Sequence, residues 1–362
     1  MAEQALAPDA LWPQRPRLPS PLHQTGKGPL VLLFYDGFEW RARPGAIAGG
    51  VAQARRLARF AYRSARRRQV RTGFYTAFLA LRTALEQHGC DVRVNDFRTA
   101  AAMPDYPIGL AGYPEVLSAV RLPNPVIFGP GDFGTPAAAV AVAAEDRMRL
   151  LIQPSDWFRD YYRPSCGDKV VTWFAGIDLD RWAPAPAAAK SIDMLIYDKI
   201  RWHREQQVPR LLGRLCAHLD ANGLSYRVLR YGEHHQGMFA EALHAARSMA
   251  FLCEHETQGL AYQEALAAGV PVFAWDEGEF VDPQLRREAP PGLAVSSVPY
   301  FDARCGRRFH ADGMEAQFDA FWACLPHYRP RDYVCEALSM DRSAKAYLEL
   351  YARAGARAGL AP

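Results

Sequence analysis

Two carboxylates dominate the chemistry that this chain can offer. Glu256 and Glu264 are eight positions apart, and Gly259 stands between them. The apolar run 248–253 predicts a buried parallel strand, and residues 259–268 predict a helix closed by a C-terminal glycine. We therefore expect Glu256 on a loop at the carboxyl end of a strand, and Glu264 about one turn inside the following helix.

This spacing favours the binding of a long anionic ligand over glycosidase chemistry. At about 1.5 Å per helical residue, the two carboxylates are roughly 10 Å apart. That separation exceeds what either class of glycosidase uses. It matches the reach of a nucleotide diphosphate sugar, in which a pyrophosphate lies between two polyhydroxyl rings. The backbone N–H groups of Gln258, Gly259 and Leu260, at the positive end of a helix dipole, are placed to receive the pyrophosphate.

The segment resembles the donor-site signature of retaining glycosyltransferases with the GT-B fold. The resemblance is carried by Glu256-x7-Glu264, the embedded Gly259-Leu260 and the strand that follows, through Val272. It implies that Glu256 touches the hydroxyls of the donor sugar and that Glu264 holds the ribose. It covers roughly residues 30–353 and is sharp from 173 to 278. The alternative is an ordinary strand–helix–strand unit with surface glutamates.

Basic residues follow the first expected strand of the second half, in the run 197–204. In the resembled family, cations at this position hold the donor pyrophosphate and offset the charge that leaves with the nucleoside diphosphate. Such a cation stabilises the transition state more than the ground state. Lys199 is the first candidate, and Arg204 or Arg201 is the second, because the family's Arg-to-Lys spacing is absent. The alternative is surface charge around a helix start.

The run 129–134 is formally a GxGxxG motif after a predicted strand, which is the placement of a dinucleotide fingerprint. Pro130 cannot donate an N–H in the turn, and Asp132 would put a negative charge beside a pyrophosphate. We favour a loop that lines the cleft and contacts the acceptor. The residues assigned to the acceptor side are Gly129, Gly131, Asp132 and Gly73.

No metal or cofactor is expected, the nucleotide sugar being a substrate. Asp178-Leu179-Asp180 has the DxD shape of metal–nucleotide sites, but it lies in the hinge region expected between the two halves of the chain, where a turn or helix cap explains it better. The Glu- and His-containing runs 233–235 and 254–256 supply no zinc set. The seven scattered cysteines indicate reduced, packed thiols.

The length of 362 residues favours two domains. Alternating strand and helix patterns indicate an α/β protein, and the resemblance implies GT-B: two Rossmann-like, doubly wound domains facing a central cleft. The proline- and alanine-rich run 183–190 marks a hinge, and after Val295 the pattern becomes less regular. The expected parts are an irregular tail (1–28), an acceptor domain (29–175), a nucleotide-sugar domain (176–335) and a terminal helix packing back on the first domain (336–362).

The segment 51–70 predicts a helix with one apolar face and one arginine-rich face. It is read as a solvated surface, as an amphipathic helix touching an anionic membrane surface, or as a nucleic-acid contact. No nucleic-acid-binding module accompanies it, so nucleic acid is not an expected partner. The absence of a long apolar run or signal-peptide core predicts a cytoplasmic protein. If the segment 51–70 touches lipid, we expect the protein to lie peripherally at the inner membrane face.

The resemblance predicts metal-independent transfer of a hexosyl or related sugar, with retention, to an unknown acceptor. The departing phosphate oxygen would deprotonate the acceptor, and Glu256 would orient the sugar. Two alternatives stay open. One is an NAD(P)-dependent oxidoreductase built on Gly129–Gly134, and the other is an inactive GT-B scaffold acting as a basic membrane or nucleic-acid adaptor.

Overall fold

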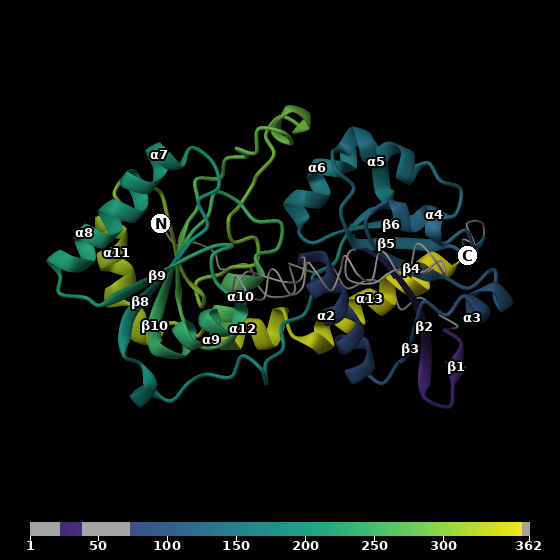
Figure 1. The fold of residues 1–362 in the computed structure, drawn as a ribbon, viewed down its shortest axis with the longest axis horizontal. Coiled ribbons are helices and arrows are strands. Elements are labelled where there is room, and N and C mark those ends of the chain that lie inside the picture. The colour runs from purple at the N-terminus through teal and green to yellow at the C-terminus, as the bar shows by residue number, and fades with distance from the viewer. Residues whose placement is uncertain (1–21, 38–72, 357–362) are drawn as a thin grey trace, which may run out of the picture.

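The computed structural model describes residues 22–37 and 73–356, which form two α/β domains side by side (Figure 1). The arginine-rich segment 51–70 and most of the predicted tail lie outside these residues. The last residues of the predicted tail contribute β1 (Gln24–Thr25), which pairs antiparallel with the start of the next strand. In the described residues, no helix is long and apolar enough to cross a membrane.

The N-terminal domain is built on a sheet that is parallel apart from β1. Its strands run in the order β1-β2-β4-β5-β6-β7, and β3 pairs with β2. Strands β2 and β4–β7 are short, largely buried runs, as expected for a sheet covered on both faces, while β3 is half-buried. Their bounds are β2 (Gly28–Asp36), β3 (Asp91–Val94), β4 (Ile108–Gly112), β5 (Val126–Gly131), β6 (Met148–Gln153) and β7 (Val170–Thr172).

Helices cover both faces of this sheet. On one face, α2 (Gly73–Gln87) and α13 (Met340–Gly355) share a core with Val31 and Leu33 of β2. On the other face lie α3 (Phe97–Ala102), α4 (Glu115–Ala119), α5 (Pro136–Ala143) and α6 (Asp156–Cys166).

The C-terminal domain holds an all-parallel sheet in the order β12-β11-β10-β8-β9. Its strands are β8 (Ile192–Asp198), β9 (Tyr226–Arg230), β10 (Ala246–Leu252), β11 (Val272–Trp275) and β12 (Gly306–Phe309). One face is covered by α9 (Gln236–Ala245), α10 (Leu260–Ala267) and α12 (Pro330–Ala337). The other is covered by α7 (Arg204–Gln207), which continues through a π-helical turn (Val208–Gly213), and by α8 (Arg214–Ala221) and α11 (Met314–Ala323). The predicted fold class, two doubly wound α/β domains, is therefore confirmed.

Two parts of the sequence-based prediction differ from the structure. The region after Val295 is more regular than expected, because it contains β12, α11 and α12. Strand β4 was not predicted, since two of its five residues are glycines. A Cβ at Gly109 would lie 2.1 Å from the Tyr347 hydroxyl of α13, so the close approach of that helix requires a glycine there.

The chain passes between the domains twice, and the two passages bond to each other. The Ile177 N–H donates to the Leu338 carbonyl at 2.9 Å, and Ile177 forms a parallel bridge with Ser339. Beyond this point α13 runs back along α2 (Figure 1). The Trp173 indole N–H donates to the Ser343 carbonyl at 2.9 Å, which fastens the start of α13 to the N-terminal domain.

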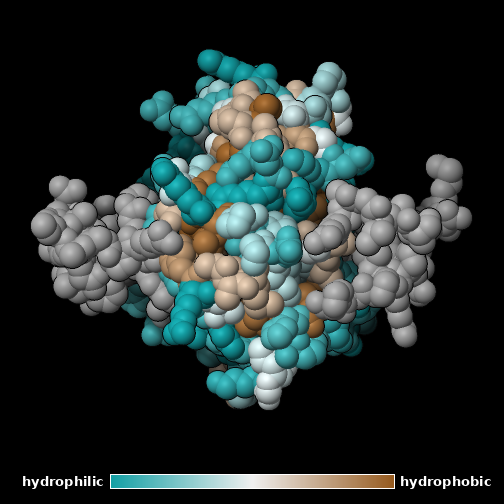
Figure 2. Space-filling model, turned by 90° about the vertical axis from the view of Figure 1, so that its right-hand side faces the viewer, coloured by the Kyte–Doolittle hydropathy of each residue, from teal (hydrophilic) through white to brown (hydrophobic). Residues whose placement is uncertain are grey.

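The end of the molecule at which the N-terminal domain lies is shown in Figure 2. Hydrophobic and hydrophilic residues are interspersed over its central part, with hydrophilic residues at the upper and lower margins. Its hydrophobic residues stand among polar ones, as is normal for the surface of a folded protein. This face gives no indication of where the chemistry takes place.

Candidate functional site

The candidate site lies at the carboxyl edge of the C-terminal sheet, where ligands bind in open α/β folds. Strands β8 and β10 are parallel neighbours, with Asp198 opposite Leu252 at their ends. The Lys199 N–H extends the ladder by donating to the Leu252 carbonyl at 2.9 Å. The register therefore places the loop that carries Lys199 beside the loop that carries Glu256.

Lys199 and Glu256 form an ion pair in a nearly buried setting. The Lys199 ammonium contacts Oε1 of Glu256, and the two side chains are 14% and 9% exposed. The Cys253 thiol donates to the same carboxylate oxygen at 3.2 Å. The ammonium also lies 4.4 Å from the centre of the Tyr231 ring, a cation–π contact.

Both members of the pair are charged at neutral pH. Burial by itself would raise the pKa of Glu256, but the charges of Lys199 and Arg201 outweigh it and leave this pKa lowered. Burial would lower the pKa of Lys199, but the charge of Glu256 outweighs that effect and leaves it raised. Glu256 is thus a carboxylate that accepts hydrogen bonds. That state suits holding sugar hydroxyls and does not suit donating a proton.

The two candidate arginines have different surroundings. Arg201 belongs to the cluster around Glu256: its guanidinium donates to the His255 carbonyl and lies 4.3 Å from the centre of the Trp202 ring. Arg204 instead makes a two-pronged contact with the buried carboxylate of Asp198, at 2.9 and 2.7 Å. The structure therefore brings Arg201 to the Lys199–Glu256 pair and commits Arg204 to a separate ion pair.

The start of α10 has the geometry of an anion-binding helix terminus. Gly259 is its N-terminal cap and adopts a left-handed conformation with φ of +84°. A Cβ there would lie 2.2 Å from the Tyr262 ring, so both space and conformation require glycine. The first N–H groups of the helix, from Leu260 onward, have no partner within the helix.

Gln258 ties this loop to the passage between the domains. Its side-chain oxygen accepts from the Ala175 N–H at 2.9 Å, and its Nε2 donates to the Ala175 carbonyl at 2.8 Å. Nε2 also lies 3.0 Å from Oε1 of Gln263. The Gln258 side chain therefore holds this loop in place. Only its backbone N–H is left to contribute to an anion-binding site.

Glu264 lies in α10 and is partly buried. Burial raises the pKa of its carboxyl to about 8, although the charge of Arg181 and a hydrogen bond with Gln236 act in the opposite direction. Tyr197 lies within electrostatic reach of both signature glutamates: after burial, Glu256 and then Glu264 contribute to raising the pKa of its hydroxyl. Both glutamates therefore lie near the end of β8, where Tyr197 stands.

The glycine-rich run does not form a dinucleotide turn. Gly129 and Gly131 belong to β5 itself, and α5 begins only at Pro136. A Cβ at Gly131 would lie 2.5 Å from the Gly112 carbonyl of β4, so this glycine serves the packing of neighbouring strands. The dinucleotide alternative is therefore not favoured.

The remaining acceptor-side candidates lie in the N-terminal domain. Asp132 follows β5 at the carboxyl edge of that sheet and accepts from the Gly134 N–H at 2.8 Å. Gly73 is the exposed first residue of α2, and its neighbour Phe74 packs on Tyr113, just beyond β4, with ring centres 6.0 Å apart. Their role toward an acceptor stays a prediction.

The structure adds residues that the sequence did not single out. Trp157 of α6 donates its indole N–H to the Glu256 carbonyl at 2.8 Å. Cys253 contacts Glu256, Tyr231 contacts Lys199, and Tyr197 lies within electrostatic reach of both glutamates. The sequence does not indicate that Trp157 contacts Glu256, because the two residues lie in different domains. Tyr197 lies near the carboxyl end of β8, and Tyr231 lies just beyond the end of β9. Their positions at strand ends could have marked them as site residues from the sequence.

A cavity of about 140 Å³ adjoins the cluster. It is lined by residues that follow β8, β10 and β11, among them Trp202, Glu254 and Glu277. Oε2 of Glu254 is buried and has no hydrogen-bond partner in the described structure. In the described residues, no cluster of three or more histidine, cysteine or acidic side chains could hold a metal ion.

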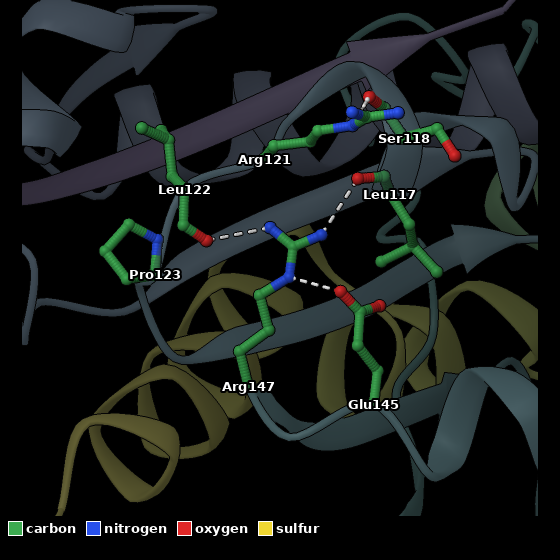
Figure 3. Close-up of a pocket in the computed structure, with 7 residues that line it drawn as sticks. All are labelled: Leu117, Ser118, Arg121, Leu122, Pro123, Glu145 and Arg147. Carbon is green, nitrogen blue, oxygen red and sulfur yellow. Dashed lines mark hydrogen bonds and ion pairs between the residues drawn. The ribbon is translucent and has the colours of Figure 1, made fainter.

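A second cavity, of about 570 Å³, lies away from the chemistry. Figure 3 shows the Arg147 guanidinium among the residues that line it, where it bonds to the Leu122 and Leu117 carbonyls, both at 2.9 Å, and to Glu145. Arg147 immediately precedes β6, so this cavity is at the amino edge of the sheet. Its arginine is engaged with the protein itself, which makes the cavity a structural feature.

Comparison with known proteins supports the fold. No family model matches the chain, and no curated protein matches its sequence. Sucrose-phosphate synthase from Thermosynechococcus elongatus superposes with a TM-score of 0.52 and 12% identity, over 89% of this chain and 98% of that one. This similarity shows that the chain has the GT-B fold.

Two further solved structures resemble the chain more weakly. AviGT4, a glycosyltransferase involved in avilamycin A biosynthesis, gives a TM-score of 0.49 and 12% identity, over 91% of this chain and 99% of that one. TarM gives 0.45 and 11% identity, over 68% of this chain and 55% of TarM. The chain thus spans about half the length of TarM. These neighbours are GT-B glycosyltransferases.

Proposed function

We propose that the protein transfers a sugar from a nucleotide diphosphate donor to an acceptor bound between its two domains. The observation that carries the proposal is the Lys199–Glu256 pair beside the N-terminus of α10, on a GT-B fold. One cation, one carboxylate and one helix terminus then face a ligand that has a diphosphate and a polyhydroxyl ring.

Each group has a distinct task in this proposal. The Lys199 ammonium and the first N–H groups of α10 stabilise the diphosphate as charge accumulates on it during departure. The Glu256 carboxylate accepts hydrogen bonds from the donor sugar and fixes its orientation, while Glu264 holds the ribose. The leaving phosphate oxygen takes the proton of the acceptor hydroxyl on the same face, which gives retention. No metal ion or cofactor takes part in this scheme.

A thermal-shift series tests the proposal directly. A ligand that binds only the folded state stabilises it by about 2.7 kcal/mol at a hundredfold excess over its Kd. UDP, GDP and ADP, each with its common sugar derivatives, should give a selective shift for one base. Glu256→Gln should keep the shift with the free diphosphate and lose most transfer. Stabilisation by NAD(P) alone, or by none of the nucleotides, would overturn the proposal in favour of the oxidoreductase or the adaptor.

The basic segment 51–70 bears on where the protein acts. We propose that it holds the protein on an anionic membrane surface, because apolar and arginine-rich faces are segregated in its sequence. Sedimentation with anionic liposomes should be strong at low salt and fade as salt rises through the screening range. Lack of sedimentation at low salt would contradict membrane binding and favour the alternative interpretation of the segment as a solvated surface.

A further inference from the structure

Trp157 belongs to the N-terminal domain and packs on residues of both domains. It is the second residue of α6 and is 7% exposed. Its ring contacts Phe158 of the same helix, with ring centres 5.0 Å apart. It also contacts two residues of the C-terminal domain, Phe280 at 5.4 Å and His255 at 5.9 Å. It does not belong to the hydrophobic cores on either face of its own sheet. Part of its burial therefore comes from the other domain, through Phe280 and His255.

The polar end of Trp157 is directed at the residue on which the chemistry depends. Its Nε1 donates to the Glu256 carbonyl at 2.8 Å in a buried setting. The Glu256 N–H donates to the Ser296 carbonyl at 3.1 Å within the C-terminal domain. The backbone of Glu256 is thus held on one side by its own domain and on the other side by α6. Together with the Lys199 contact to its carboxylate, these bonds fix where the Glu256 side chain points.

We infer that Trp157 is a positioning residue for Glu256, fastening its carbonyl when the two domains meet and so aligning the carboxylate with the donor sugar. The inference rests on the proposed function. It links the approach of the domains to the arrangement of the reacting groups, because Trp157 and Glu256 come from opposite domains.

Neighbouring contacts join the same two surfaces. The Tyr161 hydroxyl of α6 donates to the Leu285 carbonyl at 2.8 Å, and the Tyr300 hydroxyl donates to the Pro154 carbonyl at 2.7 Å. Figure 1 shows the corresponding loop of the C-terminal domain, in light green, reaching toward α6. Trp157 is the member of this set that bonds to Glu256 itself.

The test removes the indole N–H while keeping an aromatic ring at position 157. Trp157→Phe should lower kcat for sugar transfer at least about tenfold and change the Kd of the free nucleoside diphosphate by less than about threefold. Trp173→Phe is the matched control, since it removes another buried indole N–H, bonded to the Ser343 carbonyl at 2.9 Å. It should lower Tm to a similar extent and leave kcat within about threefold of wild type.

A double-mutant cycle with Glu256→Gln separates positioning from mere stability. Because Trp157 acts through Glu256, Trp157→Phe should have almost no further effect on kcat in the Glu256→Gln background. If Trp157→Phe proves too unstable to assay, benzothienylalanine at position 157 keeps the shape of the ring system and removes only the donor. Additive effects in the cycle, or equal losses of kcat in the Trp157 and Trp173 variants, would make Trp157 a structural contact only.

Experiment can separate the positioning role of Trp157 from the proposed function. Transfer by the wild type with unchanged kcat in Trp157→Phe would overturn the inference alone. A wild type that transfers sugar from none of the donors tested would overturn the proposed function and this inference with it.

Discussion

The Lys199 ammonium and the Glu256 carboxylate, from loops that leave two neighbouring parallel strands, face each other across the carboxyl edge of the C-terminal sheet. A donor with an anionic diphosphate and a hydroxyl-rich sugar offers each of them a second partner. Lys199 can bind phosphate and Glu256 can accept hydrogen bonds from hydroxyl groups while both remain charged. The pair therefore keeps two buried charges compensated before the donor arrives.

Removal of Lys199 should affect stability and transfer separately. Lys199→Met leaves the Glu256 charge buried without its partner, a type of change that costs about 3–5 kcal/mol. The double variant Lys199→Met/Glu256→Gln removes both charges and should recover most of that loss in urea unfolding, while transfer stays low. Failure of the double variant to recover would show that the pair is not the source of the instability.

Arg201 and Arg204 should behave differently because only Arg201 joins the cluster around Glu256. Arg201→Met should weaken the binding of the nucleoside diphosphate about tenfold, or roughly 1.4 kcal/mol. Arg204→Met removes the partner of the buried Asp198 carboxylate and should lower Tm with little change in that affinity. Calorimetry on the two variants decides the assignment, and the reverse pattern would exchange their roles.

The local part of the site was predictable from sequence. The apolar run before Glu256, the helix between the glycines and the following strand appear as β10, α10 and β11 with ends shifted by only a few residues. These signals are short-range: strand runs, helical spacing and capping glycines are set within a few residues of each other. Neighbouring parallel strands then place Lys199 near Glu256, because their carboxyl ends share an edge.

The tertiary partners of the site could not be predicted in this way. Trp157 lies 99 positions from Glu256, and nothing near it in sequence indicates that its N–H meets that carbonyl. The choice between Arg201 and Arg204 depends on which carboxylate each side chain reaches. Strand β12 was not predicted, because two of its four residues are the exposed Arg307 and Arg308 at the edge of the sheet, so the sequence shows no apolar run there.

Gly259 should be required for nucleoside diphosphate binding, and this requirement can be separated from the effect of backbone strain on stability. Gly259→Ala combines a left-handed residue, which costs an L-amino acid about 1–2 kcal/mol, with a Cβ pressed on Tyr262. Gly269→Ala is the control, because Gly269 has φ of +73° and a Cβ there would meet only Pro184 at 3.6 Å. Both should lower Tm, and only Gly259→Ala should weaken nucleoside diphosphate binding, because it displaces the N-terminus of α10. Equal binding by the two variants, measured by calorimetry, would remove this terminus from the site.

Glu264 should make nucleoside binding depend on pH. With its pKa raised to about 8, the carboxyl is mostly protonated at neutral pH in the free protein. The ionised form offers two acceptor oxygens to the ribose hydroxyls, so binding should tighten as pH rises from about 6 to 9, by up to about tenfold per pH unit below the pKa. A nucleoside without phosphates is the probe of choice, because it carries no phosphate group that titrates in this range. Glu264→Gln should bind more weakly at pH 9 and show a flat profile.

The same shift has a consequence for stability with a defined sign. Because the folded-state pKa of about 8 lies above the ordinary value of 4.5, the folded protein binds more protons than the unfolded chain between these two values. This contribution to the free energy of unfolding is fully present below about pH 4.5 and is lost as pH rises through about 8. Glu264→Gln cannot ionise, so its stability relative to wild type should increase from pH 5 to pH 9 in urea unfolding. A constant difference across that range would mean that Glu264 ionises in the folded protein as it does in the unfolded chain, and the predicted pH dependence of nucleoside binding would then disappear as well.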